Sequence, residues 1–189
     1  MGKKLLEMTK EELWQLFPIY LVEHKNYWAN WYAEELSLLK RIFPDNYIAR
    51  ISHIGSTAIV EIWAKPIVDI LVEIRNEKYL SYIKGILLSN GYLCMAEDKK
   101  RISLNKGYTE EGFAERVYHL HLRCLGDNDE LYFRDYLKEY SDIAKEYESL
   151  KLALWKEYEH DRDGYTGSKT AFIREQTIKA KEKYKGRYG

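Results

Sequence analysis

One stretch, residues 53–74, constrains the fold of this chain more than any other. Two runs rich in β-branched and apolar residues, 47–54 and 67–74, flank a turn that begins at Gly55. Such runs predict strands, glycine allows the positive backbone angles of a tight turn, and Ser56 or Thr57 can cap a short helix. We therefore expect a sheet built around a strand, a turn with a short helix, and a second strand.

The second of these strands carries two carboxylates in an otherwise apolar run. A carboxylate in a buried strand is costly unless it is paired or binds a cation. Asp69 and Glu73 share one face because four is an even offset, yet they lie about 13 Å apart along the strand, too far for one metal ion to bridge. Any metal at Asp69 must draw its other ligands from elsewhere, and we expect Glu73 at the strand end near solvent.

In the rest of the chain, strands alternate with helices up to residue 124, and only helices follow. We expect helices over 9–17, 26–43 and 77–90, strands over 19–23, 92–96, 101–105 and 116–124, a loop over 106–115, and then helices over 130–139, 141–158 and from 165 or 168 to 184. This order predicts an α+β or mixed-sheet α/β domain with a C-terminal helical layer.

The turn and the first carboxylate have the parts of a phosphate site. Backbone N–H groups and hydroxyls at Gly55, Ser56 and Thr57 suit an anion, and Asp69 can hold a hard cation. The same triplet also fits an ordinary turn. Lys65 adds a positive charge before the second strand, where it meets a phosphate or is simply solvated.

Further polar residues flank this unit. His53 directly precedes the turn and can donate to the same ligand. His119 and His121 share one strand face about 6.6 Å apart, where they can bind a metal, act as a base or contact phosphate; the alternative is a histidine pair on a solvated face. Arg101 and Lys106 flank a strand and the following loop, and either can contact an anion.

Composition limits the partners. The 189 residues include 30 basic and 30 acidic side chains, so net charge favours neither nucleic acid nor membrane as a partner. We find no pattern typical of a signal peptide or a membrane-spanning helix. Cys94 and Cys124 share no metal-ligand spacing and are expected as buried free thiols in a reducing compartment. We therefore expect a cytoplasmic protein.

Several separate motifs, in register, resemble the GrpB (UPF0157-like) family. They are RISHIGSTAI, KPIVDILVEI, YHLHLR, FRDYL and a final Y-x-x-x-K-x-x-FIRE that begins at Tyr165. The resemblance covers residues 19–183. It implies a nucleotidyltransferase-like fold, of the class that includes DNA polymerase β and the antibiotic-modifying nucleotidyltransferases. It also implies a single domain over 1–189, with a helical extension at 1–18 and C-terminal helices at 127–189 packed on the sheet.

The resemblance also implies a site. In nucleotidyltransferases a Gly-Ser turn binds the triphosphate, and the next strand carries two acids at an offset of two that hold Mg²⁺. Gly55 and Ser56 match the turn and Asp69 matches the first acid, but Leu71 stands where the second belongs. A later strand offers two histidines in place of a third acid. These departures weaken the case for two-metal nucleotidyl transfer.

The leading hypothesis is a nucleotidyltransferase-fold protein that binds a nucleotide or another phosphorylated small molecule. As an enzyme it would transfer a nucleotidyl group from a nucleoside triphosphate with Mg²⁺ or Mn²⁺. In that enzyme Asp69 would position the metal ion, Ser56 and Thr57 would hold phosphate oxygens, and Lys65 would neutralise charge. His119 or His121 would activate the acceptor. The alternatives are a non-catalytic binding or adaptor module, favoured by the missing acid, and a single-metal or histidine-dependent phosphotransfer or hydrolytic enzyme.

Overall fold

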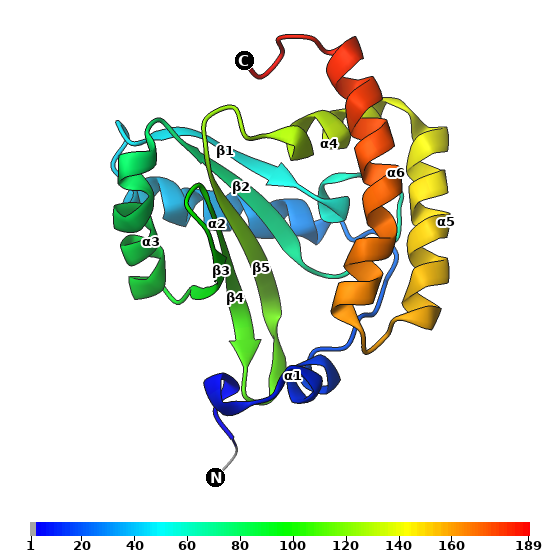
Figure 1. Cartoon of the computed structure of the whole chain (residues 1–189), viewed down its shortest axis with the longest axis horizontal. Coiled ribbons are helices and arrows are strands. Elements are labelled where there is room, and N and C mark those ends of the chain that lie inside the picture. The colour runs from blue at the N-terminus through cyan, green and yellow to red at the C-terminus, as the bar shows by residue number, and fades with distance from the viewer. Residues whose placement is uncertain (1–2) are drawn as a thin grey trace.

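A mixed five-stranded sheet lies at the centre of the protein, and the computed structural model describes residues 3–189 (Figure 1). The strand order is β1-β2-β5-β4-β3. The strands are β1 Ile48–Ile54, β2 Val68–Ile74, β3 Leu93–Glu97, β4 Arg101–Thr109 and β5 Gly112–Cys124. β2 and β5 run parallel and the other neighbours antiparallel. The predicted mixed-sheet α+β class is confirmed.

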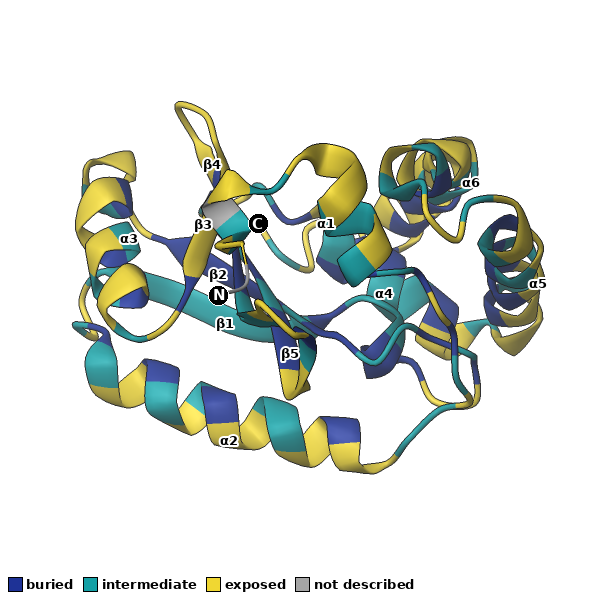
Figure 2. Cartoon of the chain, turned by 90° about the horizontal axis from the view of Figure 1, so that it is seen from below, coloured by how far each residue is buried: buried dark blue, intermediate teal, exposed yellow. Residues whose placement is uncertain are grey.

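Two groups of helices surround the sheet. The α-helices of residues 3–189 are α1 Lys10–Leu16, α2 Tyr27–Ile42, α3 Leu80–Ser89, α4 Asp129–Glu139, α5 Ser141–Glu157 and α6 Arg162–Lys183. α2 and α3 cover one face, and the buried residues of α2 point toward the strands (Figure 2). α4, α5 and α6 pack on one another beside the sheet (Figure 1). No helix within 3–189 is both long enough and apolar enough to cross a membrane.

The structure corrects three local predictions. Residues 19–23 form only a single bridge, between Val22 and Ala64, instead of a strand. The expected loop at 106–115 is mostly strand, because β4 and β5 continue into a hairpin and Gly107, at φ +88°, takes up an irregularity in their register. Cys94 is exposed, because β3 is the sheet edge.

Strand register divides the side chains between two faces. Val68, Ile70 and Val72 point toward α2 and α3 and form the main core; full burial of each such side chain contributes about 1.5–3 kcal/mol. Asp69 pairs in register with His119 on the opposite face, which we call the site face. Alternation of side chains along a strand therefore gives one apolar face and one face that carries the polar candidates.

Candidate functional site

A cavity of about 160 Å³ opens on the site face between the sheet and the helices α5 and α6. Its walls are Gly55, Ser56, Thr57, Lys65, Ile67, Asp69, His119, Tyr147, Lys151, Tyr165 and Lys169. The cavity thus unites the predicted turn, the predicted carboxylate and one predicted histidine with side chains from two C-terminal helices.

The turn needs its glycine for two reasons. Gly55 has a φ of +70°, and a Cβ placed there would lie 2.3 Å from Oδ2 of Asp69. The short helix predicted after it is one 3₁₀ turn, Ser56–Ala58. Its hydroxyls do not cap the helix as expected: the Thr57 hydroxyl donates to the carbonyl of Ile67 at 3.2 Å, and Ser56 accepts a hydrogen bond from Lys151 at 3.1 Å.

His53 supports the turn from behind the cavity wall. Its Nε2 lies 3.0 Å from the Thr57 hydroxyl, and its ring stacks on Tyr32 with centroids 4.7 Å apart. Burial lowers the pKa of His53 to about 4, although the charge of Asp69 acts in the opposite direction. The side chain is therefore neutral at neutral pH, and the structure ties it to Thr57.

Asp69 lies against both predicted histidines. Its Oδ1 is 3.4 Å from Nδ1 of His119 and 3.6 Å from Nε2 of His121. Burial by itself raises the pKa of Asp69, but contacts with the two imidazoles outweigh it and hold the pKa far below its usual range. Burial lowers the pKa of His119 more than Asp69 raises it. The result is a fixed carboxylate at the cavity wall.

Three lysines from three separate segments converge on this cavity. Lys65 precedes β2, Lys151 lies on α5 and Lys169 lies on α6. The ammonium groups of Lys65 and Lys169 lie 5.5 and 4.0 Å from the ring centre of Tyr165. Within residues 3–189 none of the three forms an ion pair with a carboxylate, and the site gathers cations that contact aromatic rings.

Lys151 is the most enclosed of the three, with 2% of its surface exposed. Its ammonium group donates to the Ser56 hydroxyl at 3.1 Å and to the carbonyl of Trp63, and it lies 4.9 Å from the ring centre of Tyr147. These contacts direct Lys151 toward the glycine turn.

The environment lowers the pKa of all three lysines. Burial, followed by repulsion from Arg162, lowers the pKa of Lys65 to about 8. Burial lowers the pKa of Lys151 and of Lys169 to about 7, and for Lys169 the charges of the other two lysines add to the effect. A bound anion opposes these causes because it stabilises the charged form of each lysine.

The sequence contained an unused signal for the two helical lysines. Tyr147 and Lys151 are four residues apart on α5, and Tyr165 and Lys169 are four apart on α6. Residues at this offset are neighbours on a helix face, and each lysine lies over the ring of its own tyrosine. A repeated Y-x-x-x-K pattern therefore marks the two helix faces that line the cavity.

Two residues that were predicted to contact an anion, Arg101 and Lys106, do not line this cavity. Arg101, at the far end of β4, forms an exposed ion pair with Asp127 at 2.6 Å. Lys106 lies on the α2 face, where it pairs with Glu35 at 2.8 Å, because β4 continues through this position and alternation turns the side chain away from the site face.

Glu73 is also corrected, because it is fully buried instead of near solvent. It accepts hydrogen bonds from the backbone of Gly126 at 3.1 Å and from Asn128 at 2.9 Å, and Arg50 lies 3.2 Å away. The helix that follows β5 covers this strand end, so Glu73 ties the sheet to the start of α4.

The residues present do not fit the two-carboxylate clamp that holds Mg²⁺ in nucleotidyltransferases. Leu71, at the second acid position, has no exposed surface and packs with Ile54 and Leu131. Asp69 is the only carboxylate of residues 3–189 among the cavity walls. Nor does that part of the chain group three or more His, Cys, Asp or Glu side chains so that they could hold a metal ion.

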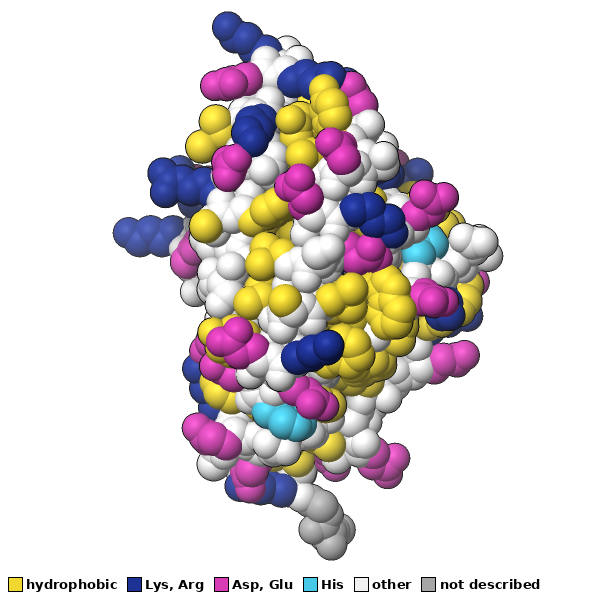
Figure 3. All heavy atoms as spheres, turned by 90° about the vertical axis from the view of Figure 1, so that its right-hand side faces the viewer, with side chains coloured by type: hydrophobic (Ala, Val, Ile, Leu, Met, Phe, Trp, Pro, Cys, Tyr) yellow, Lys and Arg dark blue, Asp and Glu magenta, His cyan; other side chains and the backbone are white. Residues whose placement is uncertain are grey.

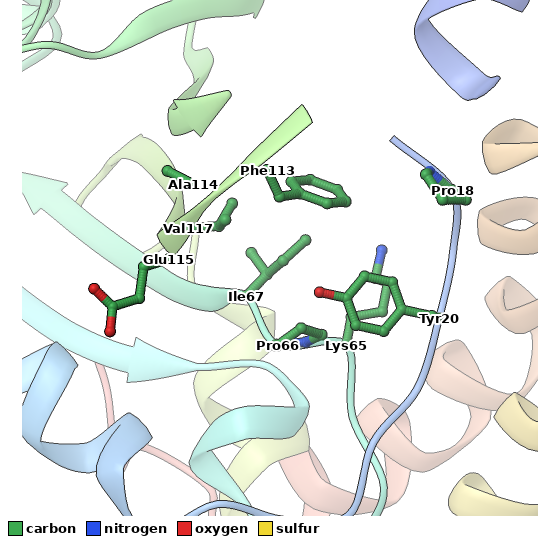
Figure 4. Close-up of a pocket in the computed structure, with 9 residues that line it drawn as sticks. All are labelled: Pro18, Tyr20, Lys65, Pro66, Ile67, Phe113, Ala114, Glu115 and Val117. Atoms are coloured by element: carbon green, nitrogen blue, oxygen red, sulfur yellow. The ribbon is translucent and has the colours of Figure 1, made fainter. Parts of the chain in front are cut away.

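A second, smaller cavity adjoins the first and shares Lys65 and Ile67 with it. Figure 4 shows the Lys65 side chain beside those of Tyr20 and Ile67, with Phe113 and Pro18 on the same rim.

The charge of the lysine-lined cavity differs from that of the outer face in Figure 3, where acidic and basic side chains are interspersed. The three lysines therefore form a local cationic site within a chain of zero net charge.

The fold and site define an α+β protein with a cation-lined cavity beside its sheet. The family model described as GrpB protein matches residues 18–179, and the chain belongs to the GrpB family. UPF0157 protein YqkA of Bacillus subtilis (strain 168) is 33% identical over 181 residues, 93% of this chain and 52% of that protein. Glutamate-rich protein GrpB of Alkalihalophilus pseudofirmus is 34% identical over 164 residues, 83% of this chain and 92% of that one. The chain thus spans about half the length of YqkA.

A solved structure of the same family agrees with this assignment. The crystal structure of GrpB from Enterococcus faecalis superposes with a TM-score of 0.75 at 30% identity, covering 87% of this chain and 99% of that one. The structure of Cid1 poly(U) polymerase bound to MgGTP superposes with a TM-score of 0.49 at 14% identity, and the match covers 72% of this chain and 43% of that one. At this TM-score the second likeness carries no argument about fold or activity.

Proposed function

We propose that this protein binds a phosphorylated small molecule whose phosphate groups contact Lys65, Lys151 and Lys169. The observation that carries the proposal is the convergence of three ammonium groups in one cavity that offers a single carboxylate, Asp69. When all three lysines are protonated, the site has an excess of two positive charges. Buried charges are costly without partners, and phosphate oxygens supply both charge and hydrogen-bond acceptors.

The size of the cavity suits part of a ligand. Pockets for drug-sized molecules measure about 300–1,000 Å³, whereas this cavity measures about 160 Å³. A phosphate group with the atoms next to it fits such a volume, and the rest of the ligand extends beyond it. Nucleotides remain within the proposed class.

The site supports binding better than two-metal nucleotidyl transfer. Leu71 removes one acid of the expected clamp, and three lysine side chains line the cavity beside the glycine turn. Binding through these lysines needs no divalent cation. Independence from a divalent cation distinguishes the proposed binding from the nucleotidyl transfer that the resemblance implies.

The test is calorimetric titration with pyrophosphate, tripolyphosphate and ATP, once with EDTA and once with Mg²⁺. We expect binding in EDTA. Lys169→Ala should weaken it roughly ten- to a hundredfold, since a hydrogen bond to a charged group contributes about 1.5–3 kcal/mol. The control is Lys179→Ala, which removes an exposed lysine of the same helix that pairs with Glu175.

Three results would overturn the proposal. They are no heat from any of these ligands with folded protein, binding that requires Mg²⁺, or equal loss in the two variants. The first would favour an adaptor that retains the fold without a phosphate site.

A further inference from the structure

A hydrogen bond from Arg162 to Tyr108 determines which nitrogen of His119 carries the proton. Arg162 Nη1 lies 2.8 Å from the Tyr108 hydroxyl and must donate, because a guanidinium has no acceptor. The Tyr108 proton is then free to point at Nε2 of His119, also at 2.8 Å. The imidazole proton therefore resides on Nδ1, 3.4 Å from Oδ1 of Asp69. A bare Nδ1 would instead direct a lone pair at a carboxylate.

A second arginine, in direct contact with His121, determines which nitrogen of that ring carries the proton. Nη2 of Arg123, which is buried, lies 3.3 Å from Nδ1 of His121 and again can only donate. Nδ1 is therefore the acceptor, and the proton resides on Nε2, 3.6 Å from the same Oδ1 of Asp69. Two neutral imidazoles thus direct N–H groups at one oxygen of the carboxylate.

The other oxygen of Asp69, Oδ2, is available to a ligand in the cavity. It lies against the turn, where only glycine leaves room for it. The ion-pair contacts of Asp69 within residues 3–189 are those with the two histidines, and both are made by Oδ1. Oδ2 is therefore a carboxylate acceptor at the wall of a cavity that three lysines also line.

We infer that Oδ2 of Asp69 accepts a hydrogen bond from a hydroxyl group of the ligand. The ligand class is then a phosphate ester that carries a free hydroxyl group, such as a sugar phosphate or a ribonucleotide. This inference rests on the proposed phosphate site. A phosphate oxygen cannot be the partner of Oδ2, because two anions repel, whereas a hydroxyl group donates to a carboxylate in a strong, charge-assisted bond.

The test compares ligands that differ only in their hydroxyl groups. Ribose 5-phosphate is paired with tetrahydrofurfuryl phosphate, and ATP with 2′,3′-dideoxy-ATP, in calorimetry on the wild type and on Asp69→Asn. In the wild type, at least one hydroxyl-bearing member should bind about tenfold or more tightly than its partner. Asp69→Asn should remove this preference and should bind pyrophosphate severalfold more tightly, because it removes a negative charge.

The outcomes separate the two proposals. Equal affinities within both pairs, while pyrophosphate binds, overturn the hydroxyl contact and leave the phosphate site standing. Weaker pyrophosphate binding by Asp69→Asn also overturns it. If neither pyrophosphate nor any of the four esters binds folded protein, both proposals fail.

The hydrogen-bond directions have a test that needs no ligand. Nitrogen-15 NMR of the imidazoles should show His119 protonated on Nδ1 and His121 on Nε2. Tyr108→Phe keeps the ring that packs on Phe17 and Phe113 and should change the nitrogen shifts of His119 while leaving those of His121 in place. A wild type with both rings protonated on Nε2, or a variant that shifts both equally, overturns Tyr108 as the positioning residue.

Discussion

The two faces of the sheet treat half-buried lysines in opposite ways. On the α2 face, Lys106 pairs with Glu35 at 2.8 and 3.0 Å, and the Tyr92 hydroxyl donates to the same carboxylate at 2.8 Å. On the site face, the ammonium group of Lys169 lies over an aromatic ring, and its pKa is lowered to about 7. A lysine with a carboxylate partner joins α2 to β4, whereas an unpaired lysine is available to a ligand.

This contrast shows that burial by itself does not distinguish a structural charge from a functional one. A buried cation next to its carboxylate is already compensated, and loss of either partner destabilises the fold. A buried cation without a carboxylate destabilises the free protein and gains when an anion binds. Local loss of stability in exchange for binding is typical of functional sites.

The largest effect should come from unpairing Lys106. Glu35→Gln leaves the half-buried ammonium group of Lys106 and the buried Tyr92 hydroxyl without their carboxylate. It should lower the free energy of unfolding by about 3 kcal/mol, measured by urea denaturation. The control, Glu34→Gln on the same helix, breaks an exposed pair with Arg116 and should cost about 0.5 kcal/mol or less. Equal losses would show that the Glu35 pair is not buried in solution.

The next effect should come from Gly55→Ala, which tests the close approach of Asp69 to the turn. The new Cβ meets Oδ2 and the backbone keeps a positive φ, so we expect a loss of about 2–3 kcal/mol. Gly91→Ala is the matched control, because Gly91 has a φ of +86° with open space around it, and it should cost about 1 kcal/mol. Similar losses in urea denaturation would contradict the contact with Asp69.

The effect of pH on the binding free energy should be smaller than these two losses of stability. In the free protein the pKa values of the three lysines are about 7 to 8, and a bound polyanion raises them. Binding therefore takes up protons above pH 7, and affinity for pyrophosphate should fall about tenfold, or about 1.4 kcal/mol, between pH 7 and 9. Calorimetry in buffers of different ionisation enthalpy measures this uptake. Release of protons at pH 8 would contradict the lowered pKa values.

The smallest effect should be a gain in stability on Lys169→Met. The substitution removes an unpaired charge but keeps most of the apolar chain, so the free energy of unfolding should rise by about 1 kcal/mol at pH 7. The folded-state pKa of about 7 lies below the ordinary 10.5. Wild-type stability therefore rises with pH between these values, and the advantage of the variant shrinks over the same window.

The control for this last substitution is Lys179→Met, which removes an exposed lysine paired with Glu175. It should lower stability slightly, by about 0.3–0.5 kcal/mol. Denaturation at pH 7 and at pH 9.5 measures both variants. A loss of stability in Lys169→Met at pH 7 would show that Lys169 contributes to the fold, against the proposed site.

The sequence predicted most of the fold because periodicity and breakers are local. The helix from Tyr27 to Ile42, the two strands around Gly55, and the shared face of His119 and His121 all follow from side-chain spacing. The strand alternation also placed Asp69 and Glu73 on one face of their strand. Local patterns failed where a strand continued through polar residues: Lys106 was assigned to a loop, and its true face followed only from the hairpin.

The sequence by itself determined the turn and the carboxylate strand, because each depends on residues close together in the chain. It also determined membership of a family, because several motifs follow one another in the family's order along the chain. Tertiary structure alone decided which cations join Lys65 beside that turn. Lys151 and Lys169 lie more than 80 residues beyond Asp69, and only the packing of α5 and α6 beside the sheet brings them to the cavity. It also buried Glu73 and Leu71. A charge acquires its role from its neighbours in space, and spacing along the chain does not record those neighbours.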